Sequence, residues 1–539
     1  MIPPAGWRGL DHTAMQDKTS KPVYLLDWMH VCHGWMDRSF DPALLSEHGR
    51  EIAAADLQRT GGVFPDMSGR WMVRVKVPYG IRITVEKARL DDQPWLTMDK
   101  PWEAGCGWVT VIHEQDKYRC WYGCARRDSA PEHLESDRAA NRRFGKDDAR
   151  YVLCYAESRD GRHWEKPALN QYCFNGSRAN NIVSPYGKET AVFRDDSAPP
   201  AERYKCFDFG KLTDVPPDET NPYAKSGLYG AVSPDGLSWE RLPQPLIRYF
   251  CDTQNIGYWD PESRKLVGYF RGHFLPGGEY GGRAIARAET DDFRRWPMPQ
   301  VIMTPGSEEA PCDDYYTNGF TPHPDDPTLR FFFSSIYHRN SDMVDVRLAA
   351  SRDGRVFNWV SRDPIIECRR GGQWATSAIY PGPNLLYLPD GRLGLPLRCH
   401  SQSHNETHAA YYRDYRYPPC GFCWASWEPG RLAGIEAENL GEFFTMPQVF
   451  EGSGIEINAR TTRAGAVELE IWEQVAGRHS RPVPGFTFAD NIPFRGDEYR
   501  AICRFKGQKD LTSLRGKRLE LRFRLSSAKI FSYRFANYS

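Results

Sequence analysis

One short pattern occurs four times in this chain, and an internal repeat restricts the choice of fold more than any other sequence feature. The copies read AESRDGRHWEKP, AVSPDGLSWERLP, RAETDDFRRWPMP and AASRDGRVFNWVSRDP, and they begin at Ala156, Ala231, Arg287 and Ala349. Each contains Ser or Thr, an Asp, a Gly or second Asp, a spacer, a Trp and a Pro. An Asp-Gly step after an apolar run is typical of a hairpin turn. The repeat therefore predicts a scaffold of equivalent hairpins, with the Trp packed between units, and not a catalytic motif.

Short segments rich in β-branched and aromatic residues, bounded by Asp, Gly or Pro, surround the copies of the repeat. They form five successive units of roughly sixty to eighty residues, with three expected strands and an outer strand that carries the Trp. The first strands begin near Trp108, Thr190, Ile256, Gly319 and Pro383. This organisation predicts a five-bladed β-propeller over residues 100–432.

The flanking regions lack the repeat. Residues 441–539 alternate or run apolar in strand-sized pieces, which predicts a separate C-terminal β-sandwich. Residues 1–99 contain an expected helix over 42–58 and expected strands over 69–77 and 80–90, which predicts a small N-terminal α+β extension. The expected fold class is therefore all-β: a propeller followed by a sandwich and preceded by this extension.

Composition narrows the choice of partner and compartment. The 70 basic and 70 acidic side chains balance without a basic stripe, which argues against nucleic acid as a partner. The apolar runs are too short to cross a bilayer and the N-terminus has no signal-peptide pattern, so we expect a cytoplasmic protein without a membrane partner. The fourteen cysteines have no disulfide-framework spacing, and the CGFC motif at 420–423 lacks a second zinc-ligand pair. Homo-oligomer formation is left open.

In a propeller, chemistry is expected where the first strands of the blades converge on the central channel. Carboxylates precede these strands in four blades, at Glu103, Glu189, Asp252 and Asp314. The alternative for each is a structural role such as capping a turn, and a one-residue shift would turn Asp313 inward in place of Asp314. The other candidates for contact with a substrate are Trp102, Gln254, Asn255, Tyr316, Asn318, Trp374, Tyr380, His404 and Glu406.

Acids that share one channel raise one another's pKa, so a protonated acid and an ionised base can coexist near neutral pH. Together with Trp and Tyr rings that stack on sugars, such a pair is suited to cleaving a glycosidic bond. A second cluster, formed by His400, His404, Glu406 and His408, favours hydrogen bonds to sugar hydroxyls over a transition-metal site. This chemistry requires no cofactor, and a structural calcium ion or a water cluster in the channel is left open.

Three motifs carry a resemblance to a known group: PWE at 101–103, SRDGRHWEKP at 158–167 and DTQN at 252–255. With the five blades and the trailing sandwich, they resemble glycoside hydrolases of families 32 and 43, and most of all uncharacterised bacterial proteins similar to family 32. The resemblance covers roughly residues 80–539. By position alone it implies Asp252 as general acid and Glu103 as base or nucleophile, with Glu189 or Asp314 orienting the sugar or tuning the acid.

The sequence departs from family 32 at the nucleophile, because no stretch like WMNDPNG is present. WMDRSFDP at Trp35 lies before the first blade, and RDP at 362–364 and EC at 367–368 follow the fourth-blade Trp, so we treat these matches as coincidences. A fructan substrate therefore does not follow. The expected function is a glycoside hydrolase that cleaves a small glycoside or an oligosaccharide chain end by carboxylate acid/base chemistry in the propeller channel. The alternatives are a non-catalytic sugar-binding propeller, and a lyase or sugar-modifying enzyme that uses Tyr and His.

Overall fold

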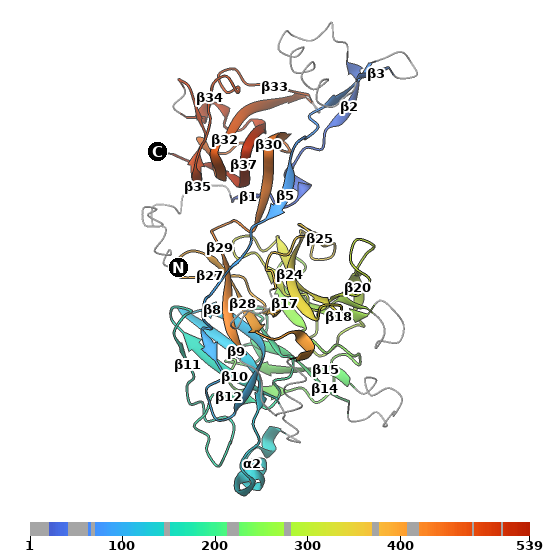
Figure 1. The fold of residues 1–539 in the computed structure, drawn as a ribbon, viewed down its shortest axis with the longest axis vertical. Coiled ribbons are helices and arrows are strands. Elements are labelled where there is room, and N and C mark those ends of the chain that lie inside the picture. The colour runs from blue at the N-terminus through green and yellow to red at the C-terminus, as the bar shows by residue number, and fades with distance from the viewer. Residues whose placement is uncertain are drawn as a thin grey trace. The chain divides into compact units, whose positions relative to one another are not determined.

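A computed structural model describes residues 21–40, 63–65, 71–144, 151–212, 226–273, 282–368, 377–406, 420–476, 479–507 and 510–538 (Figure 1). Strands make up nearly all of their regular structure, so the expectation of an all-β chain is confirmed. Helical segments are α2 (Leu134–Ala140), residues 404–406, and short 3₁₀ turns at Trp28–His30, Pro131–His133, Arg142–Phe144, Pro200–Glu202 and Thr512–Leu514. None of these described helices is long and apolar enough to cross a membrane. The helix expected over 42–58 lies outside the described residues.

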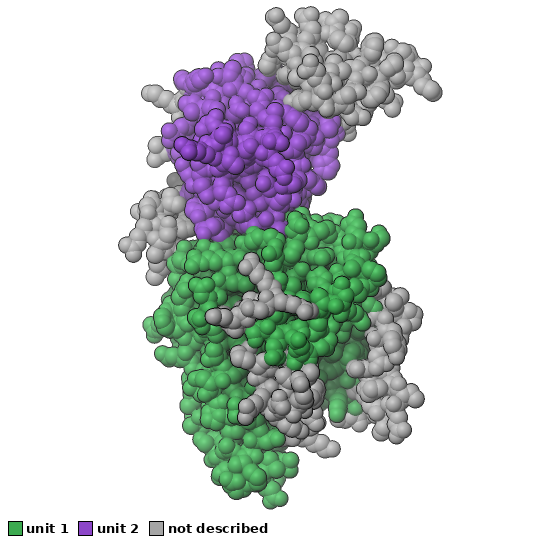
Figure 2. All heavy atoms as spheres, viewed as in Figure 1, with its two compact units in different colours: residues 1–6, 87–427 green, residues 7–86, 428–539 purple. Residues whose placement is uncertain are grey.

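The chain divides into two compact units, coloured green and purple in Figure 2. The first comprises Met1–Gly6 and Lys87–Trp427, and the second comprises Trp7–Glu86 and Glu428–Ser539. Residues 1–99, expected to form one extension, are thus divided between the two units. The second unit therefore combines residues from both ends of the chain.

The first unit consists of antiparallel strand sets that follow one another along the chain. The first set is β8 (Glu103–Glu114), β9 (Lys117–Arg126), β10 (Tyr151–Ser158) and β11 (Trp164–Glu165), and β12 (Ile182–Ser184) pairs with β10. The second set is β13 (Ala191–Arg194), β14 (Tyr204–Lys211), β15 (Ser226–Ser233) and β16 (Glu240–Arg241). The third set is β17 (Ile256–Asp260), β18 (Lys265–His273), β19 (Arg283–Thr290) and β20 (Gln300–Met303). Pairing in chain order needs only hairpin connections.

The fourth and fifth sets belong to one sheet, joined by a parallel bridge between Val344 and Ala378. The fourth set is β21 (Asp313–Tyr315), β22 (Phe320–Pro322), β23 (Arg330–His338), β24 (Met343–Ser351) and β25 (Asn358–Trp359). The fifth set is β26 (Ala378–Pro381), β27 (Leu386–Tyr387), β28 (Leu393–His400) and β29 (Cys420–Trp427). β6 (Arg89–Leu90) and β7 (Leu96–Thr97) pair with the outer side of β29. An N-terminal segment of the unit thus completes its last set.

The sets follow one another in a closed order. β8 contacts β13, β13 contacts β17, β19 contacts β21, β24 contacts β26, and β28 returns to contact β8. Gln254 fixes part of this arrangement, because its Nε2 donates to the carbonyl oxygens of Val109 (2.9 Å) and Thr190 (3.2 Å) in the first two sets.

The four sequence repeats form the turns that follow the third strands. In the second copy, Ser233 Oγ accepts a hydrogen bond from the Gly236 amide (2.9 Å), and Asp235 Oδ1 accepts two amides farther along. Gly236 has φ of +74°, a conformation that favours glycine. Its carbonyl oxygen accepts from Trp239 in the same turn (2.9 Å) and from Trp121 in the preceding set (2.6 Å). The repeat is therefore a turn that also joins neighbouring sets.

Trp121→Phe is expected to lower the free energy of unfolding by about 1–3 kcal/mol, because it removes a buried donor and some ring volume from the join between two sets. Trp121 is only 1% exposed. Trp239→Phe is the matched control. It deletes the other hydrogen bond to the Gly236 carbonyl, but the Trp239 ring is only half-buried. Chemical denaturation of the full chain measures both, and a larger loss in Trp239→Phe would contradict the joining role of Trp121.

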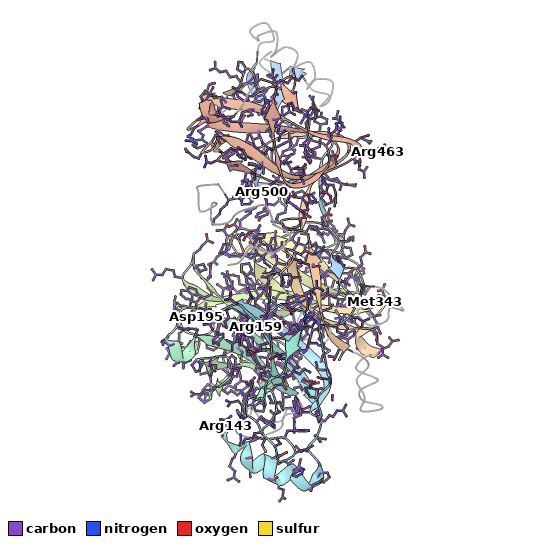
Figure 3. All side chains as sticks on the ribbon, turned by 90° about the vertical axis from the view of Figure 1, so that its left-hand side faces the viewer. Arg143, Arg159, Asp195, Met343, Arg463 and Arg500 are labelled. Carbon is purple, nitrogen blue, oxygen red and sulfur yellow. The ribbon has the colours of Figure 1, made fainter. Side chains whose placement is uncertain are left out.

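The second unit is built on a sheet with the central order β33-β32-β37-β30-β5. Its strands are β1 (Val23–Tyr24), β5 (Arg82–Val85), β30 (Ala433–Phe444), β31 (Gln448–Val449), β32 (Gly454–Ala476), β33 (His479–Pro482), β35 (Asp497–Ile502) and β37 (Arg518–Ala536). Smaller sheets pair β2 (Trp35–Phe40) and β3 (Val63–Pro65) with β4 (Trp71–Val75), and β34 (Asn491–Ile492) with β36 (Arg504–Phe505). The apolar faces of β32, β37 and β30 supply most of one buried core. Arg500, labelled in Figure 3, donates to Glu456 of β32 (2.8 Å).

Candidate active site

A cavity of about 80 Å³ in the first unit is lined by residues of the first, second, fourth and fifth strand sets and of the segments between their strands. Its wall brings together aromatic, basic, thiol and carboxyl side chains that are far apart in the sequence. The lining residues are Cys106, Gly107, Trp108, Tyr151, Gly187, Lys188, Glu189, Tyr316, Tyr380, Arg398, His400 and His404. A concave site with apolar rings and a few convergent polar groups is the usual form of a small-molecule site.

Glu189 is the carboxylic acid among the lining residues. It lies just before β13 and has φ of +60°, a left-handed conformation that is uncommon for a residue with a Cβ and that often marks functional sites. Its Oε2 atom is buried and has no hydrogen-bond partner among the described residues. Burial raises the pKa of Glu189 to about 8, Lys188 opposes this shift, and the charge of Asp252 adds to it. The group is therefore protonated at neutral pH and can donate a proton.

The charge of Asp252, which precedes β17, raises the pKa of Glu189, as does that of Asp208, but Asp252 is not among the residues that line the cavity. Its Oδ1 accepts a hydrogen bond from Arg271 Nη1 within an ion pair. The Arg271 side chain is 1% exposed and that of Asp252 is 30% exposed, so the carboxylate keeps an accessible edge. Arg271 Nη2 also donates to the Tyr316 carbonyl (2.8 Å), and its guanidinium lies 4.5 Å from the centre of the Tyr316 ring. A buried, fixed cation thus holds this second carboxylate in place.

Aromatic rings and basic groups from the first, fourth and fifth sets form the other wall. The Trp108 and Tyr380 rings meet edge to face with centroids 5.3 Å apart. The Arg398 guanidinium lies 5.3 Å from the Trp108 ring and 5.2 Å from the Tyr380 ring. Tyr380 Oη and His404 Nδ1 are 2.5 Å apart, and Tyr316 packs against His404. These groups offer ring faces and hydrogen-bond donors to a polyhydroxylated ligand.

The structure does not bring Glu103 or Trp102 into this cavity. Glu103 is 1% exposed, and its carboxylate accepts from Tyr122 Oη (2.6 Å) and from Lys166 Nζ (2.7 and 2.9 Å). The Trp102 indole donates to Asn181 (3.0 Å). β8 begins at Glu103, so the strand continues for several residues before Cys106 and Trp108 reach the cavity. Glu103 is therefore committed to a buried ion pair away from the cavity.

Asp314 also serves an ion-pair network instead of lining the cavity. Its carboxylate accepts from Arg283 Nη1 (2.7 Å) and Arg339 Nε (2.8 Å). Burial raises its pKa, but the hydrogen bonds from Arg339 and Arg283 outweigh burial and leave the pKa below its usual value. Asp313, the alternative to Asp314 after a one-residue shift of the strand, pairs with His338 (2.8 Å). Neither of the two aspartates therefore lines the cavity.

Most of the expected amide contacts hold the backbone. Gln254 bridges two strands as described, and Asn255 Nδ2 donates to the carbonyls of Cys251 and Thr253 (both 2.8 Å). Asn318 Nδ2 donates to the Tyr269 carbonyl (3.2 Å). Glu406 accepts from the Ser403 amide (3.1 Å). Of the expected contact residues, Tyr316, Tyr380 and His404 line the cavity, whereas Trp374 and His408 lie outside the described residues.

Sequence reasoning missed the charged groups that set the electrostatics. Lys188 is adjacent to Glu189, and Arg271 interrupts an otherwise apolar strand, β18, which is a detectable signal. Arg398 has the same position in β28. Burial raises the pKa of Asp208, on β14, to about 7, and the positive charges of Arg241 and Lys188 oppose the shift. A lone charged residue within a buried strand needs a partner, so Arg271 and Arg398 could have been flagged.

One group of side chains among the described residues is arranged to hold a metal ion: Cys106, His400 and Cys420. The cluster expected from His400, His404, Glu406 and His408 is different, because only His400 is shared. A calcium ion in the channel stays a prediction that no contact in the structure tests.

No protein-family profile matches the chain. Two curated proteins of Mycobacterium tuberculosis match part of it. Uncharacterized protein Rv1502 of strain ATCC 25618 / H37Rv is 28% identical over 181 residues, and uncharacterized protein MT1551 of strain CDC 1551 / Oshkosh is 26% identical over 181 residues. Each match covers 32% of this chain and 48% of the relative, so the chain spans about half the length of the curated relatives it matches.

Solved structures that the chain resembles include one described as a glycoside hydrolase, with 13% identity, a TM-score of 0.42 and coverage of 64% of this chain and 93% of the other. A second is a family 43 arabinoxylan arabinofuranohydrolase from Bacillus subtilis in complex with cellotetraose, with 9% identity, a TM-score of 0.34 and coverage of 81% and 97%. A third is the α-L-arabinofuranosidase PaAbf62A from Podospora anserina in complex with cellotriose, with 11% identity, a TM-score of 0.37 and coverage of 64% and 98%.

Proposed function

We propose that the chain is a glycoside hydrolase whose reaction takes place in the cavity of the first unit. The observation that carries this proposal is Glu189, a buried carboxylic acid in a left-handed conformation whose pKa is about 8. The charge of Asp252, a second carboxyl group that is fixed by Arg271, contributes to this raised pKa. Hydrolysis of a glycosidic bond needs one acid to protonate the leaving oxygen and a second carboxylate to act as base or nucleophile.

The geometry favours Glu189 as the acid and Asp252 as the base or nucleophile. Glu189 is protonated at neutral pH and its Oε2 has no partner among the described residues, so it can reach a leaving oxygen. Asp252 is paired with a buried guanidinium and retains an accessible edge, as a base or nucleophile requires. This assignment reverses the expected role of Asp252. It also replaces Glu103, which is fully engaged by Tyr122 and Lys166.

The remaining cavity groups supply contacts to the sugar. Trp108, Tyr316 and Tyr380 present rings, and His404, held by Tyr380, presents a polar edge. Buried hydrogen-bonding groups that match substrate hydroxyls are the usual source of specificity in such sites.

We further assign the five strand sets to the blades of a five-bladed β-propeller and the second unit to a β-sandwich. Support for the propeller comes from pairing in chain order within each set and from the closed order of contacts that returns from β28 to β8. The outer strands β6 and β7 would close the ring between the N-terminal and C-terminal parts of the unit.

The function is tested by screening the purified full chain against aryl glycosides and against oligosaccharides labelled at the reducing end. We expect turnover of at least one class, and in Glu189→Gln the loss of turnover of oligosaccharides, whose leaving groups need protonation. The anomer formed first, read by proton NMR, then distinguishes an inverting from a retaining reaction. Binding of sugars without turnover by wild type would contradict the proposal and support the non-catalytic alternative.

The pH profile of kcat/KM is expected to fall as pH rises through about 8, because Glu189 acts only while protonated. The direction follows from the raised pKa: the acid is competent below that value and loses its proton above it. Lys188→Met removes a charge that lowers the Glu189 pKa, so the fall should move to higher pH. The pH profiles of wild type and Lys188→Met measure the shift. If the alkaline fall in kcat/KM occurs at the same pH in both proteins, a group other than Glu189 causes it.

A further inference from the structure

Three side chains from separate parts of the first unit meet at one edge of the cavity. Cys106 lies in β8, His400 ends β28, and Cys420 begins β29. One ligand atom from each, two thiol sulfurs and a ring nitrogen, lies within 4.8 Å of the others. His400 and Cys420 are direct cross-strand neighbours, and the Cys106 amide donates to Cys420 Sγ (3.1 Å). The fold therefore fixes the cluster from two neighbouring strand sets.

We propose that Cys106, His400 and Cys420 form a binding site for a zinc-type transition-metal ion. Thiolates and imidazole are the ligands that zinc prefers, and hard cations such as calcium avoid them. Zn–S bonds of about 2.3 Å and Zn–N bonds of about 2.0 Å place tetrahedral ligand atoms roughly 3.5–4 Å apart. Atoms that already lie within 4.8 Å of one another need only small movements to reach those separations.

The position of the cluster gives the ion a defined environment. Cys106 and His400 both line the cavity. Three protein ligands leave a fourth coordination position, which is the arrangement of zinc sites that bind water or substrate. The open position would face the cavity, where a hydroxyl group of a bound sugar or a water molecule can occupy it. Two thiolates also neutralise the charge of a divalent ion, so the site is compatible with the nearby Arg398.

Arg398 competes with a metal ion for the His400 side chain. Its Nε donates to His400 Nε2 (2.8 Å). Metal binding at either ring nitrogen breaks this hydrogen bond: at Nε2 the ion takes the lone pair, and at Nδ1 the ring proton moves to Nε2. Arg398 must then turn away from His400 while its contacts with Trp108 and Tyr380 can remain. We therefore expect Arg398→Met, which keeps the apolar stem, to increase zinc affinity.

The chain offers a matched control within the same two strands. Cys399 of β28 and Cys423 of β29 are diagonal neighbours across the strand pair, with sulfurs 3.3 Å apart. Both are fully buried, and no metal-binding group among the described residues includes them. Cys423→Ser therefore changes the thiol content and the strand pair without touching the proposed ligands.

The test is reconstitution of the reduced full chain with zinc, followed by desalting and elemental analysis, and a parallel titration with cobalt(II). Wild type should retain roughly one ion per chain and show the thiolate-to-cobalt charge-transfer absorption of a site with cysteine ligands. Cys106→Ser and Cys420→Ser should lose the ion and this absorption, whereas Cys423→Ser should keep both. Circular dichroism confirms that each variant is folded.

The wild-type spectrum alone can overturn the proposal, whatever happens to the variants. Absence of retained zinc, or a cobalt spectrum without thiolate charge transfer, would show that the cluster is not a metal site. Equal losses in Cys423→Ser and Cys106→Ser would also reject it. The readouts concern only metal, so failure here leaves the glycosidase proposal intact, and failure of the glycosidase test leaves the metal site intact.

Discussion

Glu189→Gln is expected to lower kcat for a glycoside with an alkyl leaving group by roughly 10²–10⁴-fold, because the amide cannot transfer a proton. For a nitrophenyl glycoside the loss should be much smaller, since that leaving group departs without protonation. The change keeps the shape of the side chain and demands no new backbone conformation at φ +60°. Steady-state kinetics on the two substrates give the ratio of the two losses, which is the measure of acid catalysis.

Glu103→Gln is the control for this comparison. It alters the other glutamate that the sequence indicated, whose partners are Tyr122 and Lys166. It should lower stability by about 1–3 kcal/mol, because buried Lys166 loses one carboxylate partner and keeps its ion pair with Asp99. Activity per folded molecule should be kept for both substrates at a temperature well below unfolding. Equal losses for both substrates in Glu189→Gln, or a selective loss for the alkyl glycoside in Glu103→Gln, would reject the assignment of Glu189 as the acid.

The repeat shows how far the sequence could predict the scaffold. Its Ser, Asp and Gly form the expected turns, and the same hydrogen bonds recur at Ser158, Asp160 and Gly161. The packing of the Trp could not be read from the motif. Trp164 and Trp239 in the motif are half-buried, whereas Trp121 and Trp424, outside it, are almost fully buried and donate to the turn carbonyls. Which indole is buried depends on the neighbouring set, and that information is not local.

The candidate site could also be predicted only in part, because contacts from other strand sets decide what each side chain does. Glu189 lines the cavity, as its place just before a first strand led us to expect, whereas Asp252, in an equivalent place, is not among the lining residues. Glu103 does not line the cavity, because it begins β8 and the strand reaches the cavity only at Cys106, so equal placement before a strand did not mean equal depth. Asp314 does not line the cavity either, and it pairs with Arg283, which begins β19, and with Arg339, which follows β23. A sequence shows where a carboxyl group stands along a strand but not which cation from elsewhere engages it.

Asp252→Asn is expected to lower kcat by roughly 10²–10⁴-fold for both the alkyl and the nitrophenyl glycoside, because a base or nucleophile is needed whatever the leaving group. The variant also removes the negative charge that helps to raise the Glu189 pKa, so the alkaline fall of its residual activity should move to lower pH. Both readouts come from the same set of pH-rate profiles on two substrates.

A small anion provides the discriminating control for Asp252. In Asp252→Ala, azide or formate can enter the space left by the carboxylate beside Arg271, whose buried guanidinium would otherwise lack its partner. Added anion should restore part of the activity on the nitrophenyl glycoside, and the same anion should do nothing for Glu189→Gln. A selective loss on the alkyl glycoside in Asp252→Asn, without rescue in Asp252→Ala, would instead make Asp252 the proton donor and would leave Glu189 to tune its pKa.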